Sequence, residues 1–245
     1  MGESITVTGM VLAAMPVGEY DKRLVILTRE RGRIAAFARG ARRMNSPFLA
    51  GSRPFSFGEF TLYEGRSSYT VSSVSIHNYF AELSQDYMGA VYGFYFMELA
   101  EYYTRENTDE SQMLKLLYQS FRALCNEKLP DELVRLVFEL KTLTINGEYP
   151  QMFACVECGS TEGLQTLDVQ RGGILCRECQ EDRGQHLSEP AVYAMQYIIS
   201  SPIGKLYTFT VSDRVLAELK EAVGSFMHRY MDRSMKSLEI LESMY

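Results

Sequence analysis

Apolar and polar residues alternate through the first 80 residues, which is the pattern of β-strands with one buried face. Ile5, Val7, Gly9 and Val11 occupy every second position of the first run, and Arg31-Gly32 supplies a hairpin-type turn between the second and third. The strands predicted in this way span residues 4–14, 23–28, 33–39, 57–63 and 68–76. Five short strands predict a small closed barrel such as an OB-fold, although an SH3-like barrel or a small open sheet fits the same pattern.

From residue 78 the apolar residues recur at helical spacing. Residues 87–103 are apolar and aromatic nearly all round, which predicts a helix at the centre of a bundle with its rings in the core. Within it we expect Glu98 to be hydrogen-bonded in a structural role. Two amphipathic stripes follow, made of Leu114, Leu117, Phe121 and Leu124, and then of Leu133, Leu136, Leu140 and Leu143.

Helices resume near the end of the chain after an irregular segment. Their boundaries are indicated by Asn146-Gly147 with Pro150, by Ser188 with Pro190, and by Ser212 or Asp213. We expect a long helix after residue 213 and a short final helix around residues 235–243.

Four cysteines in two close pairs, Cys155 with Cys158 and Cys176 with Cys179, lie in the irregular segment. The 17 residues between the pairs fit the spacing of a tetrahedral zinc site, and Gly159 suits the turn after the first pair. A redox dithiol or disulfides are the alternatives, but two pairs around a predicted hairpin favour zinc. Four thiolates leave no open coordination position, so we expect one structural zinc ion and no zinc-dependent hydrolysis.

The fifth cysteine, Cys125, falls on the apolar side of a predicted helix, and we expect it in the core. The whole pattern predicts an α+β multidomain chain. Its parts are an OB-fold nucleic-acid-binding domain at residues 1–79 and a helical domain at residues 80–245, with the zinc module at residues 151–185.

The net charge of −6 is unevenly distributed. Residues 1–80 carry 10 Lys and Arg against 6 Asp and Glu, whereas residues 81–150 carry 6 against 12. Gly40 lets the loop after the third strand approach a phosphate backbone closely, and guanidinium groups fork onto phosphates. The predicted DNA-binding residues are Lys22, Arg23, Arg33, Arg39, Arg42 and Arg43. If the barrel brings them together, they form a groove for a nucleic-acid backbone; a solvated basic loop without a ligand is the alternative.

Other classes of function lack support in the residues. The sequence contains no nucleotide-binding glycine motif, no metalloprotease motif and no serine-hydrolase motif, so we expect a protein that is not an enzyme. No apolar run reaches membrane-spanning length and no basic residue precedes Lys22, so we expect a cytoplasmic protein without a signal peptide.

Several short segments follow one another in a distinctive order: Gly9-Met10-Val11-Leu12, Gly18-Glu19-Tyr20-Asp21, Gly32 through Ala38-Arg39-Gly40-Ala41-Arg42-Arg43, then Ser46, Leu49, Pro54 and Phe55, and later Phe138-Glu139-Leu140-Lys141, Gly147, Tyr149-Pro150 and Cys155-Val156-Glu157-Cys158-Gly159. This ordered set resembles the RecO family of bacterial recombination mediators. Their shared order over nearly the full length makes the resemblance specific.

The resemblance implies a bacterial, nucleoid-associated DNA repair protein that binds single- and double-stranded DNA and anneals complementary strands. It also implies partners: the single-stranded DNA-binding protein SSB through its C-terminal tail, and RecR, with which RecA is loaded. An acidic tail with an apolar end needs a hydrophobic notch beside basic groups, and Lys115, Arg122 and Arg135 on the outer faces of helices are candidates. A zinc-stabilised interaction scaffold and an RNA-binding zinc protein are the alternatives.

Overall fold

The computed structural model describes residues 4–66, 68–180 and 184–244, which divide into two compact units. The first unit comprises Met1–Cys125 with Met235–Tyr245, and the second comprises Asn126–Ser234. Compact units need not coincide with folding domains, so the bounds 1–79 and 80–245 stay a prediction.

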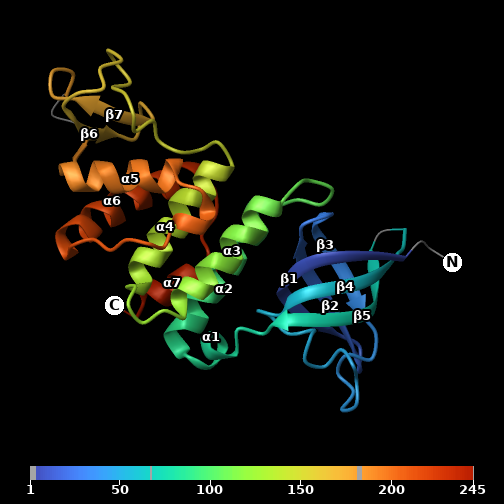
Figure 1. Cartoon of the computed structure of the whole chain (residues 1–245). Coiled ribbons are helices and arrows are strands. Elements are labelled where there is room, and N and C mark those ends of the chain that lie inside the picture. Colours follow the sequence, from blue (N-terminus) through green and yellow to red (C-terminus); the bar gives the residue numbers. More distant parts are fainter. Residues whose placement is uncertain (1–3, 67, 181–183, 245) are drawn as a thin grey trace. The chain divides into compact units, whose positions relative to one another are not determined.

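The first unit begins with a closed barrel of five strands (Figure 1). They are β1 (Ser4–Val17), β2 (Asp21–Thr28), β3 (Gly32–Ala38), β4 (Phe57–Glu64) and β5 (Tyr69–Asn78). Around the barrel the order is β1-β2-β3-β5-β4, with β3 and β5 parallel and the other pairs antiparallel. The sequence prediction of an OB-type barrel is therefore confirmed.

Alternating positions of the strands fill the barrel. Its core is an apolar cluster of Val7, Val11, Leu24, Ile26, Ile34, Ala36, Ala38, Ala41, Phe60, Leu62, Tyr69 and Val71. The β2–β3 hairpin turns at Gly32, which has a φ of 64°. A Cβ there would lie 2.2 Å from the carbonyl oxygen of Arg105, so the position requires glycine for both its backbone angle and its space.

Helices complete the first unit: α1 (Ala81–Gln85), α2 (Tyr87–Tyr103), α3 (Ser111–Leu124) and α7 (Lys236–Glu242). Tyr92, Tyr95 and Phe96 of α2 are buried, as predicted, but Tyr87 is 68% exposed and Phe94 45% exposed, so α2 is not enclosed on all sides. The carboxylate of Glu98 accepts hydrogen bonds from the first two amides of α7, which confirms its structural role.

The prediction for Cys125 is wrong. This residue terminates α3 and is exposed, because the helix ends there and the chain turns away. The apolar stripe of α3 that precedes it is buried at Leu114, Leu117 and Phe121 and half-buried at Leu124.

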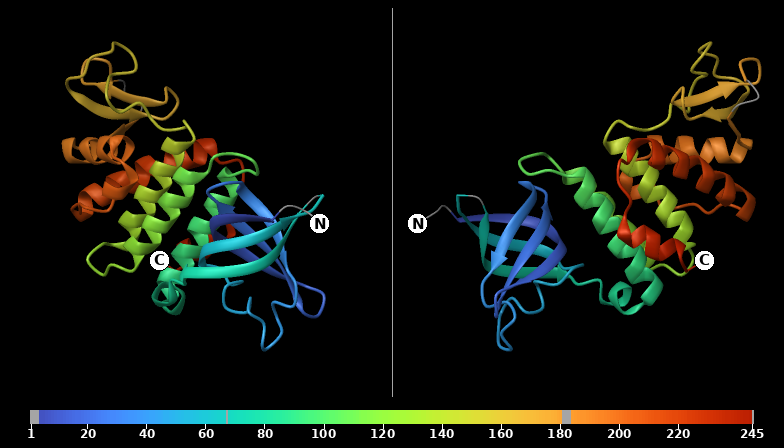
Figure 2. Two further views of the ribbon diagram at one scale, coloured as in Figure 1. Left: turned by 45° about the vertical axis from the view of Figure 1, so that its right-hand side comes forward. Right: turned by 180° about the vertical axis from the view of Figure 1, so that it is seen from behind.

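The second unit consists of helices and a small sheet. Its elements are α4 (Asp131–Ile145), β6 (Leu164–Asp168), β7 (Gly173–Cys176), β8 (Gln185–His186), α5 (Glu189–Ser200), the 3-10 turn η1 (Ile203–Lys205) and α6 (Asp213–Tyr230). Both α5 and α6 pack against α4, and the views in Figure 2 show the three helices side by side. The sheet has the order β7-β6-β8. The side chain of Ser212 caps α6, as predicted.

Candidate metal centre and nucleic-acid interface

Cys155, Cys158, Cys176 and Cys179 converge at one end of the β6–β7 hairpin, with all four sulfur atoms within 4.8 Å of one another. The Sγ atoms of Cys158 and Cys176 are 3.7 Å apart. A regular tetrahedron with metal–sulfur bonds of about 2.3 Å has edges of about 3.8 Å. The described residues therefore fit a tetrahedral four-thiolate metal site.

Backbone turns hold each cysteine pair in place. The amide of Gly159 donates to the carbonyl of Cys155 at 2.9 Å, and the amide of Gln180 donates to the carbonyl of Cys176 at 3.0 Å. The φ of Gly159 is 75°, which confirms that glycine is needed after the first pair. The predicted hairpin is also present, with Gly172 in its turn and Arg229 of α6 donating to the carbonyl of Val169.

The electrostatics of the four thiols favour a bound cation. Burial opposes ionisation of Cys155, but backbone amides of Cys158, Cys176 and Glu157 donate to its sulfur and lower its pKa to about 6. Hydrogen bonding to the thiols of Cys158 and Cys176 raises the pKa of Cys179 to about 12. Without a cation the side chain of Cys179 stays a thiol near neutral pH, whereas a divalent metal stabilises adjacent thiolates.

The surroundings of the sulfurs suit a structural site. Cys155 and Cys176 are buried and pack with Leu175, while Val156 and Leu164 lie at the edge of the same apolar cluster. A metal bound by four cysteines has no open coordination position for substrate or water. The arrangement can therefore organise the hairpin but supplies no Lewis-acid catalysis.

The β3–β4 loop holds three of the predicted basic residues at one end of the barrel. Ala41 is inserted into the barrel core, the amide of Gly40 donates to the Asp21 carboxylate at 2.7 Å, and the amide of Arg42 donates to the carbonyl of Tyr20 at 2.9 Å. With its backbone held in this way, the loop exposes the side chains of Arg39, Arg42 and Arg43.

The tip of the β1–β2 hairpin contacts two of these arginines. The guanidinium of Arg43 lies over the ring of Tyr20, 4.9 Å from its centroid, and that of Arg42 donates to the carbonyl of Gly18. Both contacts restrict side chains that would otherwise be long and mobile. They also leave donors of each guanidinium for an anionic ligand, since a guanidinium has five.

Lys22 is at the same end but is partly enclosed. Its ammonium donates to the carbonyl and hydroxyl oxygens of Ser52, both at 3.1 Å. Burial, followed by the nearby positive charges of Arg53 and Arg42, lowers its pKa below the usual 10.5. Arg53 therefore belongs to this basic cluster although the sequence analysis missed it; its place in the same loop was the available signal.

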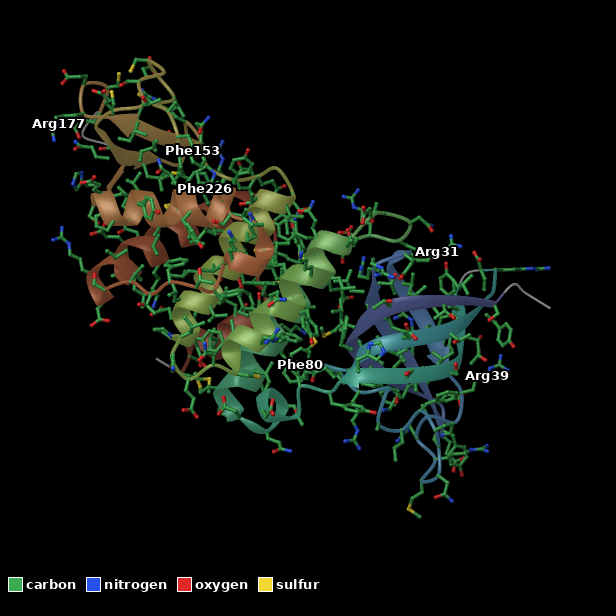
Figure 3. The ribbon with its side chains drawn as sticks, viewed as in Figure 1. Arg31, Arg39, Phe80, Phe153, Arg177 and Phe226 are labelled. Carbon is green, nitrogen blue, oxygen red and sulfur yellow. The ribbon has the colours of Figure 1, made fainter. Side chains whose placement is uncertain are left out.

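The structure does not bring all six predicted residues together. Arg23 is exposed on β2 beside Lys22, but Arg33 lies at the opposite end of the hairpin, because Lys22 pairs with Ala38 and Leu27 with Arg33. Five residues of strand separate these positions by about 17 Å. Figure 3 shows Arg31, which is close to Arg33 in the sequence, and Arg39, which follows Ala38, at separate ends of the barrel. Arg33 is therefore set apart from the other five predicted residues, and its part in DNA binding stays a prediction.

Arg33 also has internal partners. Its guanidinium donates to the carbonyl of Thr104 at 3.0 Å and contacts the Glu101 carboxylate at 3.3 Å. These contacts attach the hairpin to the end of α2 within the first unit.

The three candidate partner-binding residues lie in different environments. Lys115 and Arg122 are exposed on α3, where a spacing of seven residues places them on the same face. Arg135 of α4 is not on an outer face, because its side chain is buried. Its guanidinium lies 3.7 Å from the carboxylate of Glu132 and 3.8 Å from that of Glu139. Its predicted outward position is wrong.

Among the described helices, none combines the length and apolar character that crossing a membrane requires.

Barrel, helices and a four-cysteine module together define a multidomain OB-fold protein with a candidate structural metal site. A family model described as "Recombination protein O N terminal" matches residues 1–80, and one described as "Recombination protein O C terminal" matches residues 84–239. The chain therefore belongs to the RecO family of DNA repair proteins.

The similarity to curated RecO proteins extends over nearly the whole length of both chains. The chain is 32% identical to the DNA repair protein RecO of Symbiobacterium thermophilum, over 97% of this chain and 96% of the relative. It is 31% identical to that of Acetivibrio thermocellus, over 97% and 96%, and 30% identical to that of Alkaliphilus metalliredigens, over 96% and 98%.

Proposed function

We propose that this chain binds single- and double-stranded DNA, promotes strand annealing and, with RecR and SSB, helps to load RecA in recombinational repair. The observation that carries the proposal is the cluster of exposed arginines Arg39, Arg42, Arg43 and Arg53, held at one end of an OB-type barrel. Phosphates bind such a cluster electrostatically, and neutralising charge on two strands lowers their mutual repulsion. The chain would act on DNA at the bacterial nucleoid, in the cytoplasm, without being an enzyme.

Fluorescence anisotropy with labelled oligonucleotides over a salt series tests DNA binding. Replacing Arg39, Arg42 and Arg43 together by alanine should weaken binding at least tenfold. The slope of log affinity against log salt concentration should become shallower, by the equivalent of about two phosphate contacts. The matched control replaces three exposed cations of the second unit, Lys128, Arg177 and Lys205, and should have little effect. No binding of the unaltered chain at low salt, or equal losses in both triple variants, would contradict the proposal.

The nucleic acid itself is part of this test. An OB-type barrel is compatible with RNA as well as DNA, so competition between matched RNA and DNA oligomers belongs in the same experiment. Preference for RNA would favour an RNA-binding zinc protein. Absence of binding to either would favour an interaction scaffold.

Zinc is the ion that we propose for the four cysteines. A tetrahedral set of four thiolates matches the usual ligands and geometry of structural zinc. Bound there, zinc would hold the two cysteine turns together and so stabilise the β6–β7 hairpin. In this proposal it supports the fold and does not contact DNA.

A groove in the first unit supports the proposed binding of the SSB tail. It has a volume of about 460 Å³ and is lined by Phe57, Leu114 and Tyr118, with Lys115 and Arg29 among its polar residues. The apolar terminal residue of the SSB tail suits the aromatic lining of the groove. The terminal carboxylate and the neighbouring acids of the tail suit the cations of the groove. Arg122 extends the basic face of α3 beyond the groove, whereas the buried Arg135 is not part of this proposal.

A pull-down with SSB carrying or lacking its C-terminal tail tests this partner. We expect capture only by tailed SSB, and a loss of capture when Lys115 is replaced by glutamate. Lys128→Glu is the matched control, because Lys128 is exposed in the second unit. Equal capture of tailless SSB would contradict the proposal.

A further inference from the structure

Four residues from four adjacent strands form a row across the outer surface of the barrel. In the register, Arg23 of β2 is opposite Phe37 of β3, Phe37 is beside Thr70 of β5, and Thr70 is opposite Tyr63 of β4. Their neighbours along the strands are in the barrel core: Leu24, Ala36, Ala38, Tyr69, Val71 and Leu62. Because successive side chains of a strand point to opposite faces, the four residues of the row point outward.

The two rings of this row are accessible. Tyr63 is 46% exposed, and Phe37 is half-buried. Phe57, another outward ring of β4, differs because it packs 4.7 Å from the ring of Tyr118. Within the described residues, Phe37 and Tyr63 have no such ring contact. They are two strands apart, which corresponds to roughly 10 Å.

The row lies beside the basic end of the barrel. Arg39 follows Phe37 by two residues, and Arg23 belongs to the row itself. A nucleic-acid chain whose phosphates contact these guanidiniums would bring its bases over the two rings. Aromatic rings beside cations are the combination that binds single strands, because unpaired bases expose their faces for stacking. Paired bases inside a duplex do not.

We propose that Phe37 and Tyr63 are base-stacking residues, and that the row Arg23, Phe37, Thr70 and Tyr63 is a track for single-stranded nucleic acid. This inference rests on the proposed DNA-binding function and adds how the chain distinguishes single strands from duplex. The arginines of the β3–β4 loop contact phosphates of both forms, whereas the rings act only on unpaired bases.

Leucine variants of the full-length chain test the inference, because leucine keeps an outward apolar side chain while removing the ring. We expect Phe37→Leu and Tyr63→Leu each to weaken binding of a labelled single-stranded oligothymidylate at least ~5-fold. Binding of an abasic strand and of a duplex should change less than twofold, and the salt dependence should stay as in the unaltered chain. Phe37→Trp, which keeps an aromatic ring at this position, should bind oligothymidylate at least as tightly as the unaltered chain. Tyr87→Leu, which alters an exposed ring of α2, is the matched control.

The outcomes are distinguishable. If the unaltered chain binds no nucleic acid, both the proposed function and this inference fail. If it binds, but the leucine variants keep their affinity or lose it equally for oligothymidylate, abasic strand and duplex, the inference alone is overturned. Thermal melts by circular dichroism identify a variant that is unfolded, and Phe37→Trp then decides, since a tryptophan that stacks should bind oligothymidylate at least as tightly as phenylalanine.

Discussion

Replacing Lys141 by methionine should destabilise the second unit. This lysine of α4 is 7% exposed, and its ammonium donates to the carbonyl oxygens of Ile198 at 3.2 Å, Ile199 at 2.8 Å and Ser201 at 2.8 Å. The first two carbonyls are at the C-terminal end of α5, where no amide of the helix donates to them. Since Ser201 is extended and Pro202 follows, no glycine cap replaces the ammonium.

The magnitude follows from what methionine leaves behind. Three buried carbonyls lose their donor, at about 1 kcal/mol or more each, and the favourable charge at the helix C-terminus is lost as well. Removing a buried charge offsets part of this cost, since burial lowers the pKa of Lys141 below 10.5. Methionine has a similar length and leaves no large cavity. A net loss of about 3 kcal/mol in the free energy of unfolding is therefore expected.

Urea unfolding followed by far-ultraviolet circular dichroism measures this loss, and hydrogen exchange at the end of α5 locates it. Lys205→Met is the matched control, because Lys205 is exposed in the same unit, and it should change stability by less than about 0.5 kcal/mol. If Lys141→Met is as stable as the control, the ammonium does not hold the end of α5 and the reasoning is refuted.

Two further predictions concern the second unit. Metal analysis should find one zinc per chain. The double variant Cys155→Ser, Cys158→Ser should lose the metal and melt at a lower temperature, whereas the control Cys125→Ser should keep the metal and its melting temperature. A fully metallated double variant would contradict the assignment. Burial opposes ionisation of Glu218, but donation from Ser188 and Arg214 holds its pKa below the usual 4.5. The stability from this carboxylate is therefore fully present above about pH 5 and is lost as the pH falls through the folded pKa. The stability difference between the unaltered chain and Glu218→Gln should shrink from pH 7 to pH 3, and a constant difference would count against the carboxylate.

The barrel and the metal site could be predicted because their signals are local. Alternation along each strand located all five strands of the barrel, although β1 continues to Val17, three residues beyond the predicted end. The spacing of two cysteine pairs implied convergence because a short turn within each pair limits where the sulfurs lie.

The environments of single charged residues could not be predicted because they depend on packing between distant elements. Arg135 looks solvent-exposed in a helical stripe of leucines, but in the structure it is only 8% exposed, on a helix against which α5 and α6 both pack. Lys141 looks like a surface lysine until the end of α5, nearly 60 residues further along the chain, supplies three carbonyls. The periodic pattern of apolar and polar residues along the sequence does not indicate these contacts.

The positions of the acids determine which arginines remain available for a ligand. Arg33 and Arg135 have the same side chain as Arg39 and Arg43, yet the first two contact the carboxylates of Glu101 and Glu139. Both of those acids belong to residues 81–150, the most acidic part of the chain, whereas the β3–β4 loop contains no acid at all. Among the described residues, no carboxylate lies within salt-bridge distance of the three loop arginines, Arg39, Arg42 and Arg43. A chain with net charge −6 can therefore present a cationic surface, because Arg33 and Arg135 pair with acids of the helices whereas the loop arginines do not.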